Sequence, residues 1–360
     1  MAQPTQRLTS LDFFRGFTML LLVNAGFLHY FAGSEFEGTI VQDIFKQFSH
    51  PEWEGLRFWD LVQPFFMFIV GVAIPFSVSK RLAKGQTWGK LKGHAAQRSV
   101  LLILLGVALY TTGRDHFTLY FQNVLAQIGV TYIIAFLLMH KRPSWQILVS
   151  VGLVVLTEVL YRTFPLEGFN NPFVKDQNFG TFFDQLISDG SRDGWVSFNA
   201  IPTAAHTIWG VLCGKLLLSS QTDRQKLRTL VIAGVIALAV GYSLTTVSPI
   251  IKRIATSSFV FVSGGYTILA LALTYWIIDM KQYKNWAMFG VIVGMNPLFI
   301  YLFNHFGFSD IVQQIVEPWY HLVLGWTDQT VVEALARATV WFFNWYLCYL
   351  LYKRKIFVRI

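Results

Sequence analysis

The chain has 360 residues, of which 54% are hydrophobic, 16% aromatic and only 14% charged. Soluble globular domains usually carry about 25% charged residues, and no polar stretch of this sequence is long enough to form one. The composition therefore excludes a soluble protein. It predicts an all-α, polytopic integral membrane protein whose residues 1–360 form a single domain.

Ten apolar stretches are long enough to cross a bilayer as helices, which takes about 20 residues each. Most of them are bounded by polar segments or by segments that contain glycine and proline. The predicted spans, in chain order, are 11–31, 58–81, 94–113, 119–139, 145–164, 196–219, 227–247, 255–279, 287–307 and 328–352. An even number of spans places the N and C termini on the same side of the membrane.

Basic residues gather on one side of this predicted topology. They precede the first span, fill alternate connections and close the chain: Arg7; Lys80, Arg81, Lys84, Lys90, Lys92 and Arg98; Lys141 and Arg142; Arg224, Lys226 and Arg228; Lys281 and Lys284; Lys353, Arg354, Lys355 and Arg359. The positive-inside rule makes this side, and with it both termini, cytoplasmic. The connections predicted to face outward are 32–57, 114–118, 165–195, 248–254 and 308–327.

The net charge of +9 then reflects membrane topology. No nucleic-acid partner is expected, because the basic residues flank apolar spans instead of sharing one surface with exposed aromatic residues. Cys213 and Cys348 both lie within predicted spans, unlike the disulfide cysteines of exported loops. No close pairing of cysteine and histidine supports a metal site. The first apolar run lacks a small-residue cleavage site, so it is predicted to be a retained helix and not a signal peptide.

The first predicted span opens with "RLTSLDFFRGFTMLLLVN", residues 7–24. Asp12 and Arg15 are three residues apart and share one face of its first turns. They form either an ion pair at the cytoplasmic interface or a site in which Arg15 binds an anionic cofactor and Asp12 orients it. Asn24 lies about 13 Å further along, at 1.5 Å per residue, and projects from the opposite side of the helix. Its polar side chain is either functional or bonded to a neighbouring helix.

A second polar cluster runs directly into the next span, in "FSHPEWEGLRFWDLVQPFFMFIVG", residues 48–71. His50 lies about two turns before the span, and Asp60 and Gln63 share a face at its start. The ordinary pKa of a histidine lies near neutrality, which suits a general base, a general acid or a transient nucleophile. A single histidine in a loop is more often an ordinary surface residue, so these residues alone leave its role open.

Weaker candidates lie in later spans. His206 lies inside the sixth span, where it could be a packed core histidine, and Asn199 lies near its outer end. The stretch "GMNPLFIYLFNH", residues 294–305, places Asn296 and His305 in the ninth span. The Gly/Asn/Pro cluster can also simply bend that helix where neighbouring helices satisfy its backbone.

Two long motifs resemble the paired signatures of the heparan-alpha-glucosaminide N-acetyltransferase family, including its bacterial members. They are "RLTSLDFFRGFTMLLLVN" and "HPEWEGLRFWDLVQPFFMFIVGVAI". Shorter stretches resemble the family in the same order: "NVLAQIGVTY" at 123–132, "NAIPTAAHTIWGVLCG" at 199–214, "TSSFVFVSGG" at 256–265, "GMNPLFIY" at 294–301 and "YLLYKRKIF" at 349–357. The resemblance covers essentially the whole chain.

The resemblance implies a polytopic α-helical enzyme that moves acetyl from cytosolic acetyl-CoA, its cosubstrate, to a terminal glucosamine on the other side of the membrane. It carries the family's catalytic histidine to His50 and its active-site asparagine to Asn24. Family members commonly read "GVLQR" where residues 123–127 read "NVLAQ", so a basic residue is missing here. The animal members' large N-terminal luminal domain is also absent, so the resemblance does not assign heparan itself as the acceptor. Without an organellar N-terminal extension, the expected location is a bacterial inner membrane.

The chemistry of N-acetyl transfer suggests a role for each candidate. His50 would deprotonate the attacking amine or carry a transient acetyl group. Asn24 would bind the acetyl oxygen or position the amine, and Asp60 would fix the histidine tautomer. No metal is expected. The residues expected to bind the cosubstrate, mostly at the cytoplasmic mouth, are Asp12, Arg15, Arg98, Asn296, Lys353, Arg354 and Lys355.

Two other functions remain open at this point. One is a membrane acyltransferase that acts on another cell-envelope glycan. The other is a transporter that uses Asn24, Asp60, His206 and Asn296 as a polar path, although inverted repeats typical of transporters are not evident. The expected partners are an amino-sugar or oligosaccharide acceptor and membrane lipid, and the sequence is compatible with a homodimer.

Overall fold

A computed structural model describes residues 8–33, 36–112, 118–188, 190 and 193–358 of the chain. Arg7 and Arg359, and all but the last residue of the 114–118 connection, lie outside the described residues. The described part contains helices and no strand. The helices, in chain order, are α1 (Thr9–Val23), α2 (Ala25–Tyr30), α3 (Ile40–Phe45), η2 (Lys46–Phe48), η3 (Phe58–Leu61), α4 (Val62–Ala83), α5 (Trp88–Thr111), α6 (Val124–Leu138), α7 (Pro143–Thr163), α8 (Phe179–Ile187), η4 (Ser197–Asn199), α9 (Ala200–Leu218), α10 (Asp223–Leu244), α11 (Ser257–Thr274), η5 (Tyr275–Met280), α12 (Met288–Gly294), α13 (Pro297–His305), α14 (Phe308–Leu324) and α15 (Gln329–Lys353).

The prediction of an all-helical chain with apolar spans is confirmed, whereas the number of ten spans is not. Among the described residues, six continuous helices are long and apolar enough to cross a membrane, and the bent pair α12 and α13 raises the number to seven. The six are Phe58–Ala83, Trp88–Thr111, Pro143–Thr163, Ser197–Leu218, Asp223–Leu244 and Ser257–Met280. Three other predicted spans do not meet the criteria for crossing a membrane. The first is interrupted at Asn24, and α6 has only 15 residues. Helix α15 is long enough but not apolar enough.

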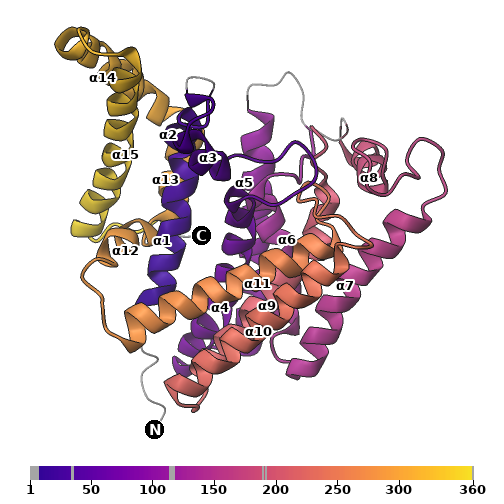
Figure 1. Ribbon diagram of the computed structural model, residues 1–360. Coiled ribbons are helices and arrows are strands. Elements are labelled where there is room, and N and C mark those ends of the chain that lie inside the picture. The colour runs from indigo at the N-terminus through magenta and orange to yellow at the C-terminus, as the bar shows by residue number, and fades with distance from the viewer. Residues whose placement is uncertain (1–7, 34–35, 113–117, 189, 191–192, 359–360) are drawn as a thin grey trace.

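Helix α4 lies at the centre of the bundle, where it packs against α1, α6 and α9 (Figure 1). The most apolar stretch of the span that contains α4 is 78% buried. The corresponding stretch of α10 is only 22% buried, so α10 presents most of its surface outward. The close contact between α4 and α9 depends on two glycines. A Cβ atom on Gly71 would lie 2.1 Å from the Thr207 carbonyl oxygen, and one on Gly210 would lie 2.2 Å from the Phe68 carbonyl oxygen. The two backbones therefore touch with no side chain between them.

Two of the predicted spans are each broken into two helices. The Gly/Asn/Pro cluster does bend the ninth predicted span, since α12 and α13 meet at 72°. Pro297 is the first residue of α13, where its missing N–H costs nothing. The break between α1 and α2 falls at Asn24. The carbonyl oxygen of Val23, next to that break, accepts a hydrogen bond of 2.9 Å from Asn304 Nδ2 on α13.

The predicted outward connection 308–327 contains a helix that the sequence analysis missed. Helix α14 forms a hairpin with α15 at one side of the molecule, while α8 lies at the opposite side (Figure 1). Exposed apolar residues of α14 recur at a helical spacing of three or four: Phe308, Ile311, Ile315, Trp319 and Leu322. The apolar residues occupy one face only, so the stretch did not qualify as a span.

Candidate active site

The turn before α4 brings His50 and Asp60 together. Asp60 is fully buried in η3, and its Oδ2 accepts a hydrogen bond of 2.8 Å from the Arg57 backbone N–H. This bond caps the start of the helix and aims the other carboxylate oxygen at the preceding loop. His50 Nδ1 donates to Asp60 Oδ1 at 2.6 Å. The Arg57 side chain holds the returning loop by donating to Ser49 Oγ at 2.7 Å and to the His50 carbonyl oxygen at 3.1 Å.

Two distant segments of the chain close around this pair. The loop between α10 and α11 places Lys252 Nζ 3.7 Å from Asp60 Oδ1, with the lysine side chain only 7% exposed. The Trp195 ring lies edge-on to the His50 ring, with ring centres 5.3 Å apart, and its centre is also 5.3 Å from Lys252 Nζ. The two segments are also bonded to each other, because the Val196 backbone N–H and the Asn199 side-chain amide both donate to the Arg253 carbonyl oxygen.

The electrostatics of the site favour a neutral imidazole. Burial lowers the pKa of His50, the charge of Lys252 lowers it further, and the hydrogen bond and charge of Asp60 act in the opposite direction. Burial also lowers the pKa of Lys252 to about 8, against the opposing effect of Asp60. With Nδ1 bonded to Asp60, the neutral ring leaves Nε2 as a proton acceptor. His50 therefore meets the electronic requirement for a general base.

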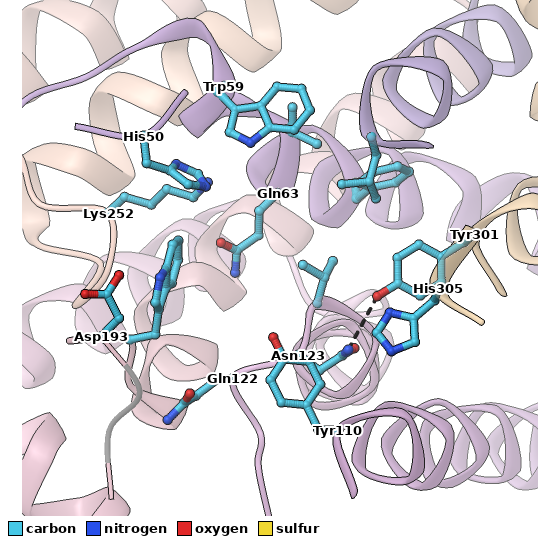
Figure 2. Close-up of a pocket in the computed structure, with 15 residues that line it drawn as sticks. His50, Trp59, Gln63, Tyr110, Gln122, Asn123, Asp193, Lys252, Tyr301 and His305 are labelled. Carbon is cyan, nitrogen blue, oxygen red and sulfur yellow. Dashed lines mark hydrogen bonds between the residues drawn. The ribbon is translucent and has the colours of Figure 1, made fainter. Parts of the chain in front are cut away.

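His50 and Lys252 open into a cavity of about 390 Å³. Figure 2 shows these two side chains on one side of the cavity and Asn123, Tyr301 and His305 on the other, with Gln63 between them. The full lining is Leu22, His50, Trp59, Val62, Gln63, Phe66, Tyr110, Gln122, Asn123, Val124, Asp193, Trp195, Lys252, Tyr301 and His305. Aromatic rings with a few amides and charges are typical of small-molecule sites.

The amide side chains of the cavity wall are fixed by hydrogen bonds. Asn123 caps α6 by accepting from the Leu125 N–H at 2.7 Å, and its Nδ2 donates to the Tyr301 hydroxyl at 3.4 Å (Figure 2). Gln127, at the position where family members carry the missing basic residue, accepts a hydrogen bond from Gln63 Nε2. A pair of amide side chains thus stands at the position where this chain departs from the family pattern.

Of the other residues proposed for the reaction, Asn24 lies apart from this cavity. It is buried at the break after α1, and its Nδ2 donates to the Leu20 carbonyl oxygen at 2.8 Å. It is not among the residues that line the cavity, although Leu22 is. The structure therefore joins His50 and Asp60 in one site and leaves Asn24 outside its lining.

Several residues predicted to bind the cosubstrate lie around the break between α12 and α13. Arg15 bonds to Asp12 at 2.6 Å and donates to the Gly294 carbonyl oxygen at 2.7 Å. Asn296 holds the segment after α15, because its amide donates to the Ile356 carbonyl oxygen and accepts from the Val358 N–H, both at 2.9 Å. This segment directly follows Lys353, Arg354 and Lys355.

Arg98 is separate from that group. It lies on α5, where its guanidinium packs over the Tyr132 ring at 5.0 Å from the ring centre. As for metals, the described part of the chain contains no group of three or more histidine, cysteine, aspartate or glutamate side chains that could hold an ion.

The sequence analysis missed several residues of the site. Lys252, Trp195 and Tyr301 line the cavity but were not singled out, and His305 was named only as a weak candidate. Asp184 on α8 was also missed: it accepts a hydrogen bond of 2.9 Å from Gln122 and so fixes that wall of the cavity. Burial raises the pKa of the Asp184 carboxyl. The sequence did hold one signal for Lys252. It lies in the predicted outward connection 248–254, whereas the positive-inside rule favours lysine on the cytoplasmic side.

Comparisons with known proteins agree with the resemblance seen in the motifs. A family model described as a domain of unknown function (DUF5009) matches residues 7–169. The heparan-alpha-glucosaminide N-acetyltransferases of human and mouse are 25% and 22% identical to the chain, each over 98% of its length. The chain spans 60% of the length of these relatives. By sequence, it is therefore a distant relative of the heparan-alpha-glucosaminide N-acetyltransferases.

Proposed function

We propose that this chain is a membrane acetyltransferase that moves the acetyl group of acetyl-CoA to the amino group of a glucosamine-type sugar. The observation that carries the proposal is the His50–Asp60 pair at the wall of a 390 Å³ cavity. A histidine whose other nitrogen is held by a buried carboxylate is the standard arrangement for activating a nucleophile. The names of the two relatives, which describe N-acetyl transfer to a glucosaminide, support the reaction class.

His50 acts on the acceptor amine in this mechanism. The nitrogen lone pair attacks the thioester carbonyl carbon, the C–N bond forms, and the carbonyl electron pair moves to oxygen. His50 Nε2 takes the ammonium proton, while Asp60 stabilises the imidazolium that results. The oxyanion then collapses, the C–S bond breaks, and the thiolate takes the proton from the imidazolium. In a second route, His50 itself first carries the acetyl group and kinetics become ping-pong.

The proposed membrane arrangement follows the charge pattern. The chain forms one domain with ten spans and with both termini on the cytoplasmic side of a bacterial inner membrane, and the His50 loop faces outward. The phosphates of CoA bind near Arg15, Lys353, Arg354 and Lys355. Asp12 orients Arg15, and Asn296 positions the basic segment by holding residues 356–358.

The direct test uses the purified full chain with acetyl-CoA and glucosamine, with free CoA and N-acetylglucosamine measured together. We expect equal amounts of the two products, both dependent on the acceptor. Release of CoA without N-acetylglucosamine indicates another acceptor, such as a cell-envelope glycan. No binding of any acyl-CoA would contradict the enzyme and favour transport of a small polar solute.

Asp60→Asn should move the pH profile of the reaction as well as its rate. The rate rises with pH as His50 loses its proton, at a pKa below the ordinary value of 6.5. Asp60 raises that pKa, so its removal lowers the pKa further and the acid limb moves to lower pH. Because the imidazole also loses its orienting partner, kcat falls by about 10–100-fold. The measurement is kcat against pH for both proteins.

The matched control is Asp310→Asn, at an exposed carboxylate on α14. It removes the same charge far from the His50 turn in sequence and should leave both the limb and the plateau of the profile unchanged. If Asp60→Asn gives the same profile as Asp310→Asn, Asp60 does not act on the base.

A further inference from the structure

The cavity is lined by a cationic side chain, Lys252, to which the proposed mechanism gives no role. Acetyl transfer develops a negative charge on the acetyl oxygen, which needs a hydrogen-bond donor at that point. The sequence analysis gave this role to Asn24, but the Asn24 amide is bonded to Leu20 and does not line the cavity. Lys252 lines the cavity beside His50.

The geometry places Lys252 within reach of the reacting atoms. His50 Nδ1 and Lys252 Nζ approach the same oxygen, Asp60 Oδ1, at 2.6 Å and 3.7 Å. The two nitrogens are therefore no further apart than these distances combined, and both side chains face one cavity. Both side chains therefore border the space beside His50 in which the reacting acetyl group would lie.

The Lys252 ammonium also retains donors for a ligand. It carries three N–H groups, and the contact of 3.7 Å with Asp60 exceeds an ordinary hydrogen bond. Its cationic neighbour is committed elsewhere, because Arg253 pairs with Asp193 at 2.8 Å. Asp193 also pairs with Lys175 at 2.6 Å. The titratable groups that act on Lys252 or are acted on by it are thus Asp60, Arg253 and His50.

We propose that Lys252 is a catalytic residue whose ammonium binds the acetyl oxygen and stabilises the oxyanion of the tetrahedral intermediate. This inference rests on the proposed acetyl transfer. Lys252 keeps its proton throughout: it donates a hydrogen bond to the oxyanion as the C–N bond forms and releases the oxygen as the C–S bond breaks. A preformed donor of this kind acts most strongly in a site that excludes water.

The test compares Lys252→Met, Lys252→Arg and Asn24→Ala with the wild-type chain, using acetyl-CoA and glucosamine. Lys252→Met should lower kcat by about 10²–10³-fold, with both KM values within a few-fold of wild type. Lys175→Met is the matched control, because Lys175 belongs to the neighbouring ion network but does not line the cavity. It should retain wild-type kcat.

The pH profile supplies a readout that a structural role would not move. Activity should fall as Lys252 loses its proton near its pKa of about 8. In Lys252→Arg the guanidinium stays charged, so this alkaline limb should disappear while at least a tenth of kcat remains. If Lys252→Met does not fold, the pH profile of Lys252→Arg still tests the role of Lys252.

Each contrary result has a distinct meaning. Wild-type activity with an unaffected Lys252→Met overturns the role of Lys252 alone, as does a Lys252→Arg profile that keeps the alkaline limb. A large loss in Asn24→Ala with none in Lys252→Met returns the oxyanion to Asn24. A wild-type chain that transfers acetyl to no amino sugar overturns the proposed function and this inference with it.

Discussion

Replacing His50 by alanine is expected to reduce acetyl transfer by about 10²–10⁴-fold, the range that a positioned general base contributes. The loss should appear in kcat, because the amine can no longer lose its proton as it attacks. His50 is partly exposed to the cavity, with a side chain 31% exposed, so its removal leaves the packed core intact. The measurement is N-acetylglucosamine formed per protein molecule, together with elution volume and thermal unfolding in detergent.

His321→Ala is the matched control for this experiment. His321 lies on α14 with a side chain that is 46% exposed, and it makes only a 4.0 Å contact with Glu317. Its loss should leave the rate unchanged. Added imidazole should restore part of the activity of His50→Ala, because the enlarged cavity can admit the missing base. A folded His50→Ala variant that keeps more than about a tenth of wild-type activity would contradict a base role.

Gly71→Leu is expected to lower the free energy of unfolding by about 3 kcal/mol, because overpacking here meets backbone and not a flexible side chain. The new side chain would enter the contact between α4 and α9, where a Cβ atom already lies 2.1 Å from the Thr207 carbonyl oxygen. Since α9 cannot yield locally, the two helices must separate. The measurement is the unfolding temperature of the purified chain in detergent, with Gly71→Ala as a milder case.

Gly152→Leu provides the control for that substitution. Gly152 is an exposed helical glycine on α7 with no atom within 4 Å of its ideal Cβ position. The same exchange there should leave the unfolding temperature unchanged or raise it slightly, because leucine has the higher helix propensity. Equal effects at both positions would mean that the α4–α9 contact is not the limiting one.

The fold class could be predicted because lipid imposes one requirement on every span, that its backbone be satisfied internally. The interruptions were harder to predict. The cluster at residues 294–297 indicated a bend through its glycine and proline, and the structure confirms it at 72°. Asn24 gave no comparable backbone signal, so α1 and α2 were predicted as one helix. Helix α14 was missed because its apolar residues cover only one face.

In the candidate site, the residues that are close in sequence could be predicted, and those that come from distant segments could not. His50 and Asp60 are ten residues apart, so one local turn and one helix cap bring them together, and the sequence alone suggested both. Trp195 and Lys252 reach the cavity from segments far along the chain, and only long-range packing places them beside His50. Their residue types gave no spacing pattern, since tryptophan and lysine occur at many other positions. Asn24 was proposed from the family motif, and the cavity leaves it out.

The two cysteines of the chain have a practical consequence. Cys213 and Cys348 are both free and both buried in the helical core. A membrane-impermeant thiol reagent should therefore find little to modify on the native protein, and no cysteine has to be removed before labelling. A single new cysteine in the exposed turn around Gln221, or in the exposed loop around Asn171, would report directly which side of the bilayer each connection occupies.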